Sequence, residues 1–192
     1  MKTKKPFALR QIYRINEETN AYMIEISLDD YDELFNGWDA SIIKRKELEP
    51  ELLDYMISAS YEISLDFPIE LWFYLEVDKE NTEREIISVQ SIVNNFKTRL
   101  HFNEMKLRSN YRKILTYILM SIGFLLFAYL MPQNFDYILF INIIVEGLFI
   151  GGWVLLWEAF SLFFFDSHDL RIKKKHLTKL KDSKIYFDYK KL

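Results

Sequence analysis

One carboxylic acid inside an apolar run is the residue of this sequence best placed to do chemistry. Glu146 lies about eight residues into the run Ile138–Phe165, which corresponds to ~12 Å along a helix. Comparable charges at such depth in a bilayer cost about 2.5–3.5 kcal/mol on insertion scales, and they usually face water or a bundle interior. Asn142 lies one helical turn earlier on the same face. The pair predicts either a polar pore lining or a hydrogen-bonded contact that holds an oligomer together.

A second set of residues in the same run suits helix packing. Gly147 and Gly151 have the GxxxG spacing, and small residues at this spacing let helices approach closely in lipid. Glu158 lies on the same stripe, eleven residues after Gly147. Trp153 and Trp157 fit the aromatic belt found where a membrane meets water. These residues favour helix association, either within one chain or between copies.

Two apolar runs position these side chains. Ile114–Leu130 has no charged residue and would be roughly 26 Å long as a helix, close to the ~30 Å hydrocarbon core of a bilayer. The second run is Ile138–Phe165, and the polar, proline-containing Met131–Tyr137 between them is long enough only for a turn. The sequence therefore predicts a transmembrane hairpin over residues 114–165, with the second span at about 138–158.

Charge is divided by region, although the net charge of the 192 residues is only −3. Residues 1–96 hold 10 Lys/Arg against 20 Asp/Glu, whereas residues 97–113 and 171–192 hold 6 against 1 and 9 against 2. Because both borders of the hairpin are basic and the turn has no Lys or Arg, the positive-inside rule predicts cytoplasmic termini. The basic borders are explained by an anionic membrane surface, at ~1 kcal/mol per charge. They do not by themselves indicate nucleic-acid binding, because the domain before them is acidic.

Residues 1–81 predict a small cytosolic α+β domain. Its strands are expected from alternation of apolar and polar residues, and its helices from caps and helical spacing. The expected elements are a β-hairpin of Phe7–Ile15 and Ala21–Leu28, one short helix over Asp29–Asp39 closed by Gly37, a helix from Pro50 to about Ile63, and a central strand over Ile69–Val77.

Residues 82–113 predict a stalk helix that continues into the first span. Thr82 and Glu85 have the spacing of a capping box. An apolar seam follows at alternating steps of three and four, as in a coiled coil: Ile86, Val89, Val93, Phe96 and Leu100. Two interpretations of the seam stay open. It either joins copies of the chain or covers the small sheet.

Residues 166–192 predict a basic cytosolic tail. Ser167–Lys181 has helical spacing of its leucines, and Lys184–Lys190 alternates as a strand does. Because both termini are expected on one side of the membrane, this last segment is predicted to join the N-terminal sheet. The fold class is therefore an α+β membrane protein, with three to four strands and two to three helices in its cytosolic domain.

No motif in the sequence supports catalysis. GxGxxG, P-loop, GxSxG and HExxH patterns do not occur, so we expect neither an enzyme nor a cofactor. The absence of cysteine excludes disulfides, Cys-based zinc sites and thiol chemistry. The three histidines, His101, His168 and His176, are too dispersed to predict a metal site.

Five aromatic residues of the predicted domain have two interpretations. They either stack on a base or nucleotide, or they form the core of the small domain. They are Tyr31, Phe35, Trp38, Trp72 and Tyr74.

Two stretches carry a resemblance to known proteins. They are Leu34–Asp39 (LFNGWD), with Pro50…Tyr55 and Pro68…Leu75 downstream, and Glu146–Phe160 (EGLFIGGWVLLWEAF). Together they span most of residues 20–165 and resemble a family of small, largely uncharacterised bacterial proteins with a cytosolic α+β domain and two membrane helices. The layout is also similar to the transmembrane effector of Hailong-type anti-phage defence, an oligomeric channel held closed by an oligodeoxyadenylate ligand. No ligand-binding motif is matched residue by residue.

Two functions are compatible with these features. The resemblance implies an oligomeric effector of the bacterial inner membrane, whose cytosolic domain senses a partner protein or a nucleotide or oligonucleotide ligand and whose helices form a pore. The alternative is an interaction protein, in which the hairpin only tethers the acidic domain to the bilayer. Glu146, Asn142 and the glycine stripe favour the first.

Overall fold

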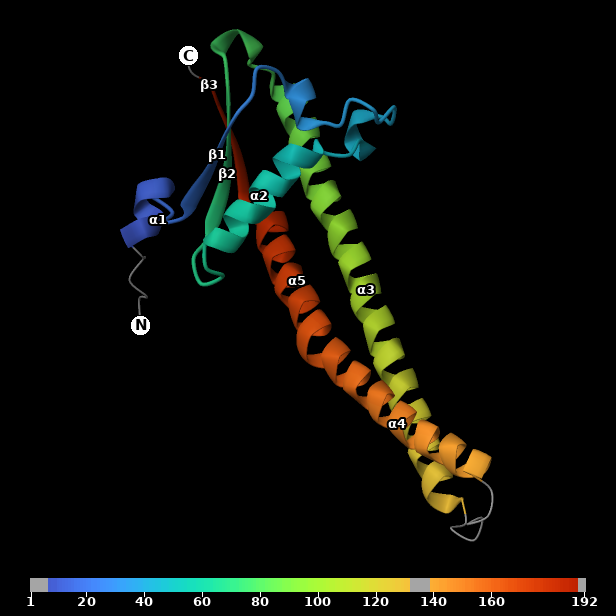
Figure 1. The fold of residues 1–192 in the computed structure, drawn as a ribbon. Helices are drawn as coiled ribbons and strands as arrows, with labels where there is room; N and C mark the ends of the chain where they lie inside the picture. Colours follow the sequence, from blue (N-terminus) through green and yellow to red (C-terminus); the bar gives the residue numbers. More distant parts are fainter. Residues whose placement is uncertain (1–6, 132–138, 190–192) are drawn as a thin grey trace. The chain divides into compact units, whose positions relative to one another are not determined.

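The computed structural model describes residues 7–131 and 139–189 of the chain (Figure 1). It has a mixed α+β fold in two compact units. Unit 1 consists of Met1–Phe102 with Lys174–Leu192, and unit 2 is Asn103–Lys173. The helices are α1 (Phe7–Ile12), α2 (Pro50–Glu62), α3 (Thr82–Leu130), α4 (Leu139–Ser161) and α5 (Ser167–Lys181), and the strands are β1 (Tyr22–Ser27), β2 (Ile69–Leu75) and β3 (Lys184–Tyr189).

The sheet of unit 1 has three parallel strands in the order β1-β2-β3, side by side in Figure 1. Ile69 and Glu70 of β2 face Tyr22 of β1 and Lys184 of β3, respectively. The predictions that β2 is central and that the C-terminal segment joins the N-terminal sheet are therefore confirmed. The predicted end of that segment, Lys190, lies outside the described residues.

The predicted N-terminal β-hairpin is wrong for most of its first strand. Phe7–Ile12 forms helix α1, and the Tyr13 N–H continues the helical pattern by donating to the Leu9 carbonyl at 2.9 Å. Pairing between the two segments is limited to an antiparallel bridge between Ile15 and Tyr22 and to two backbone hydrogen bonds beside it, from the Met23 N–H to the Arg14 carbonyl and from the Asn16 N–H to the Ala21 carbonyl, each at 2.9 Å. The alternation that suggested a strand covers only a few residues, and β1 takes the distant β2 as its partner instead. Strand formation depends on such non-local packing.

The predicted helix over Asp29–Asp39 is also wrong in its extent. Only a 3₁₀ turn forms there, at Tyr31–Leu34. The Asp30 carboxylate accepts from the Asp32 N–H at 3.1 Å, and the Asn36 side chain accepts from the Trp38 N–H at 2.9 Å. Short polar side chains that bond nearby backbone in this way compete with a continuing helix. The other expected elements of the domain, α2 and β2, are confirmed within a few residues.

The core of unit 1 lies between the sheet and the helices that cover it. Ile24 of β1, Phe73 of β2 and Met56 of α2 are fully buried in one cluster. Phe96 of α3 and Leu180 of α5 belong to the same cluster. The part of the predicted seam that contains Phe96 therefore covers the sheet, as the second interpretation of the seam expects.

Unit 2 contains the predicted hairpin. α3 is one continuous helix of 49 residues, as predicted, and the chain returns through α4 and a π-helical turn at Leu162–Asp166. Two helical segments are long and apolar enough to cross a membrane, by length and composition. Only 17% and 6% of their most apolar windows is buried inside the chain. Exposed apolar surface of this length requires an apolar surrounding or a partner. The predicted turn lies mostly outside the described residues.

A buried polar cluster in unit 1 gives the domain a pH dependence. His176 is buried, its Nδ1 lies 3.0 Å from the Ser60 hydroxyl, and its ring stacks on Tyr61 at 4.1 Å. Burial, helped by the neighbouring Lys179 ammonium, lowers the pKa of His176 below its ordinary 6.5. The unfolded chain therefore takes up this proton at a higher pH than the folded chain does. Stabilisation by His176 is complete above pH 6.5 and is lost as the pH falls through the folded pKa.

We expect the thermal unfolding midpoint of the detergent-solubilised chain to fall as the pH is lowered from about 7.5 to 5, where His residues gain a proton. The matched variant is His176→Gln, which stays neutral and can still bond Ser60. It should show a clearly smaller fall. The carboxyls of Asp30, Asp39 and Glu70 have pKa values lowered from an already acidic range, so they titrate below this window. An equal fall in both proteins would contradict the assignment to His176.

Candidate functional site

The candidate site lies on α4, whose orientation is set by close packing against α3. The Ser121 hydroxyl donates to the Gly152 carbonyl at 2.6 Å. A Cβ atom at Gly152 would lie 2.8 Å from the Leu125 Cγ, and one at Gly151 would lie 3.6 Å from the Phe124 ring. The helices therefore approach closest where α4 has no side chain at residue 152, as small residues permit.

The predicted GxxxG pair is divided by this geometry. Gly151 contacts α3, whereas a Cβ atom at Gly147 would have no heavy atom within 4 Å. Gly147 thus stays open toward the surroundings of unit 2. Gly152 was not identified from the sequence as a packing residue. The only signal in the sequence was that Gly151 and Gly152 are adjacent, and in a helix of this composition either glycine could face the neighbouring helix.

Contacts farther along the pair fix its antiparallel register. Ile114 of α3 is buried with Ala159 and Leu162. The Arg171 guanidinium donates to the Tyr111 hydroxyl and lies over the Tyr111 ring. Because these contacts continue beyond Gly152, α4 has one face on α3, and the opposite face is free for other partners.

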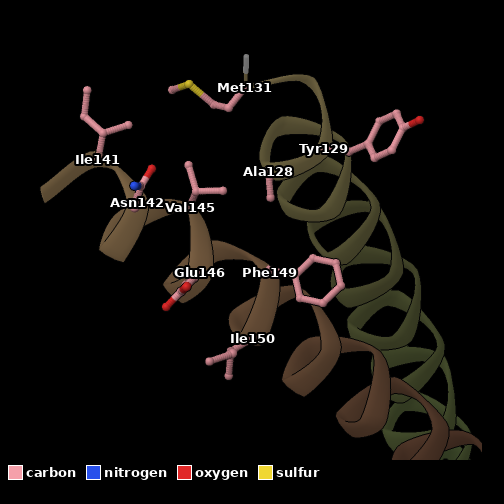
Figure 2. Close-up of a pocket in the computed structure, with 9 residues that line it drawn as sticks. All are labelled: Ala128, Tyr129, Met131, Ile141, Asn142, Val145, Glu146, Phe149 and Ile150. Atoms are coloured by element: carbon pink, nitrogen blue, oxygen red, sulfur yellow. The ribbon is translucent and has the colours of Figure 1, made fainter. Parts of the chain in front are cut away.

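Glu146 and Asn142 lie on an exposed face of α4 (Figure 2). Figure 2 shows the Glu146 side chain pointing away from α3, and the two residues border a hollow of about 460 Å³. Within the described residues, Glu146 has neither a hydrogen bond nor an ion pair. The partners expected from the first span do not bond it: Ser121 bonds Gly152, and Tyr129, although it borders the same hollow, is 84% exposed and its ring points away from α4.

Glu158 lies on a different part of the α4 surface. It is exposed and borders a second hollow, of about 840 Å³, with aromatic walls from Trp157, Phe160 and Phe164. Twelve residues separate it from Glu146, which is about 120° around a helix at 3.6 residues per turn. The two acids therefore do not form one site within a single chain. Glu146 shares its stripe with Trp153 instead, seven residues later.

The π-helical turn at Leu162–Asp166 was not expected from the sequence. One π turn adds a residue to the helix and rotates everything after it around the axis. It separates the Glu146 face from the start of α5, where Asn103 donates to the Leu170 carbonyl at 2.9 Å. The run LFFFD carries no signal that distinguishes a π turn from an α turn.

The five aromatic residues of unit 1 are not brought together. Tyr31 and Phe35 are buried in the core cluster. Trp72 stacks on Tyr186 of β3 with ring centres 4.5 Å apart, and Tyr74 donates to the Glu25 carboxylate at 2.8 Å. Trp38, in contrast, is 97% exposed. No shared stacking surface joins these rings in the part of the chain that is described.

A buried carboxylate in unit 1 was missed by sequence reasoning. Glu70 of β2 accepts hydrogen bonds from the Asn16 amide at 2.9 Å and the Trp72 indole at 3.1 Å. Burial alone would raise the pKa of Glu70, but hydrogen bonds from Thr19, Asn16 and Trp72 outweigh burial and lower it. An acid in an otherwise apolar strand is ordinarily interpreted as facing solvent, so the sequence contained no signal that Glu70 is buried. The cluster is fully bonded and stabilises the sheet.

Metal binding finds no support in the described residues, where no three His, Cys, Asp or Glu side chains come close enough to hold an ion. His101 and His168 are exposed, and His176 is buried against Ser60.

Comparisons with known protein families, curated proteins and solved structures find no match to this chain.

Proposed function

We propose that the chain is an oligomeric effector of the bacterial inner membrane, whose unit 1 senses a ligand or partner and whose membrane helices form a pore. One observation carries the proposal. The Glu146 carboxyl is exposed on the face of α4 that points away from α3, in the middle of an apolar helix. Anti-phage defence is the setting that the resemblance implies.

The physical argument starts from the cost of that carboxyl. In lipid it is tolerable only when neutral, hydrogen-bonded or in contact with water. Residues 114–165 contain no Lys or Arg, so no basic partner is available inside the hairpin. If several copies turn the Glu146 face toward a common axis, each Glu146 carboxyl can bond the carboxyls of other copies, Asn142 and water. We propose that this polar axis forms the pore.

The orientation follows from charge. Basic segments border both ends of the hairpin, so we propose cytoplasmic termini and an outward turn. Unit 1 then lies in the cytosol, where it can receive a signal. A nucleotide or oligonucleotide ligand is implied by the resemblance alone, and a partner protein is the other candidate.

The tethering alternative has one observation in its favour. α3 and α4 pack closely on each other through Ser121, Leu125 and Gly152, and this contact needs no second copy. A hairpin complete in itself would serve as an anchor. The two functions make different predictions: in the pore the outward face of α4 contacts other copies, and in the tether it does not.

Reconstitution of the purified chain separates them. We expect particles of several copies in nanodiscs, measured by mass photometry, and ion flux from liposomes that contain the chain. A reporter fused after Leu192 should be active in the cytoplasm. A monomer without flux would contradict the pore and leave the tether, and a reporter active only outside the cytoplasm would contradict the orientation.

A further inference from the structure

Residues 36–46 present the most exposed large apolar side chain among the described residues of unit 1. Trp38 is 97% exposed and Ile42 is 62% exposed. We call the surface formed by residues 36–46 the loop surface. In Figure 1 this segment, coloured blue, projects on the side of α3 opposite the strands. Because tryptophan is among the largest side chains, burying Trp38 on a partner would give about as much stabilisation as burying any single side chain can.

The loop surface is held in place by hydrogen bonds. The Asn36 N–H donates to the Glu47 carbonyl at 2.9 Å, and the Asp39 carboxylate accepts from the Glu47 N–H at 2.7 Å. From α3, Ser91 donates to the Ile43 carbonyl at 3.0 Å and Asn95 donates to the Lys46 carbonyl at 2.9 Å. Because the backbone of the loop is already held, docking Trp38 on a partner costs little backbone entropy.

The charge of the loop surface is opposite to that of its surroundings. Three of the ten Lys/Arg residues in positions 1–96 are consecutive here, at 44–46, whereas those positions hold 20 Asp/Glu. Lys44 and Arg45 are exposed. The surface is therefore basic and apolar, and it fits an acidic surface that also exposes apolar side chains.

The outer side of α2 has that complementary character. Glu51, Asp54 and Glu62 are exposed along it, and Tyr55 and Tyr61 are 47% and 44% exposed. The far end of this side is out of reach for the loop of its own chain. The bonds to α3 hold the loop next to the start of α2, whereas Tyr61 lies about 16 Å farther along that helix.

We propose that the loop surface of one copy docks on the outer side of α2 of the next copy, with Trp38 as the anchor. This inference rests on the proposed assembly of several copies and names the contact that joins their cytosolic units. Trp and Arg are the residue types that most often dominate such contacts. Because donor and acceptor are different surfaces, the contact is heterologous and generates a ring when the rotation closes.

Cross-linking between differently tagged copies tests the contact, since the chain has no native cysteine. One copy carries Ser41→Cys in the loop and the other carries Ser58→Cys on the outer side of α2; both serines are exposed. After co-reconstitution and mild oxidation, we expect a disulfide-linked product that bears both tags. The matched control replaces Ser58→Cys by Ser27→Cys, an exposed serine at the end of β1, and should give no such product.

Three further substitutions probe the chemistry of the contact. Trp38→Ala in the Ser41→Cys copy should lower the cross-linked fraction at least about tenfold, as loss of an anchor residue does. Arg45→Glu should lower it as well, and Asp54→Arg in the partner copy should restore it. Both loop residues are exposed, so the variants are expected to fold.

The outcomes separate this inference from the proposed function. Multimeric, conducting protein without a cross-link, or with a cross-link unaffected by Trp38→Ala, would overturn the contact and leave the pore standing. A cross-link in multimers that carry no ions would support the contact and contradict the pore. A strict monomer would overturn both.

Discussion

Ion flux should fall to the background of empty liposomes when Glu146 is replaced by leucine. The variant Glu146→Leu removes the only ionisable group on the outward face of α4 between Asn142 and Trp153. Without a polar side chain the proposed axis has no partner for water or ions, and an apolar constriction of this kind closes a pore by dewetting. Flux is measured with a fluorescent indicator inside liposomes that contain equal amounts of each protein.

The variant Glu146→Gln separates the hydrogen bonding of the Glu146 side chain from its charge. The amide still hydrogen-bonds across copies, so particle mass in nanodiscs should equal that of the wild type. It cannot ionise, so the pH dependence of flux should be flattened or lost. Ile150→Leu, one turn later beside the same hollow, changes shape but not polarity and should conduct as the wild type does. Wild-type flux in Glu146→Leu would remove Glu146 from the mechanism and favour the tether.

Gly152→Leu should give the largest loss of stability in unit 2. Any Cβ atom there meets Leu125 at 2.8 Å and the Ser121 carbonyl at 3.4 Å, and the remaining atoms of a leucine have no space between the helices. The side chain would force α3 and α4 apart and break the bond from Ser121 to Gly152. Overpacking typically costs about 1–3 kcal/mol, and the lost hydrogen bond adds about 1 kcal/mol.

The measurement is the midpoint of thermal unfolding in detergent, followed by circular dichroism. Gly123→Leu on α3 is the matched control, because a Cβ atom there has no neighbour within 4 Å. Gly147→Leu separates two contacts: it is equally open within the chain, so a loss of particle mass in this variant would show that the glycine stripe joins copies. Equal midpoints for Gly152→Leu and Gly123→Leu would contradict the close approach at Gly152.

Several elements were determined by the sequence alone because their signals are local. Pro50 at the first position of α2, the apolar run of β2 and the unbroken stretch from Thr82 to Leu130 each specify an element without reference to the rest of the chain. The alternation after Lys184 also predicted β3. In a long, periodic segment such as α3, many residues favour the same helical structure. A single tertiary contact therefore cannot change its secondary structure.

The pairing of the strands was decided by tertiary structure. β1 has the alternation of a half-buried strand, which is equally compatible with an antiparallel neighbour at Phe7–Ile15 and a parallel neighbour at β2. The buried cluster around Ile24 and Phe73 selects β2, because only that partner puts one face of both strands against α2 and α3. Phe7–Ile12 is then free to form α1.

The site shows the same division. Composition alone determined that an acid lies deep in an apolar helix, since Glu146 has no charged neighbour in the sequence for several turns. Which side of α4 meets α3 depended on side-chain volume at one contact: Gly152 leaves room for Leu125, whereas a Cβ atom at Gly147 would have no neighbour within 4 Å. A helix that is apolar on every side has no amphipathic stripe from which its packed face could be predicted. Only the packed pair of helices decided that Glu146 points outward.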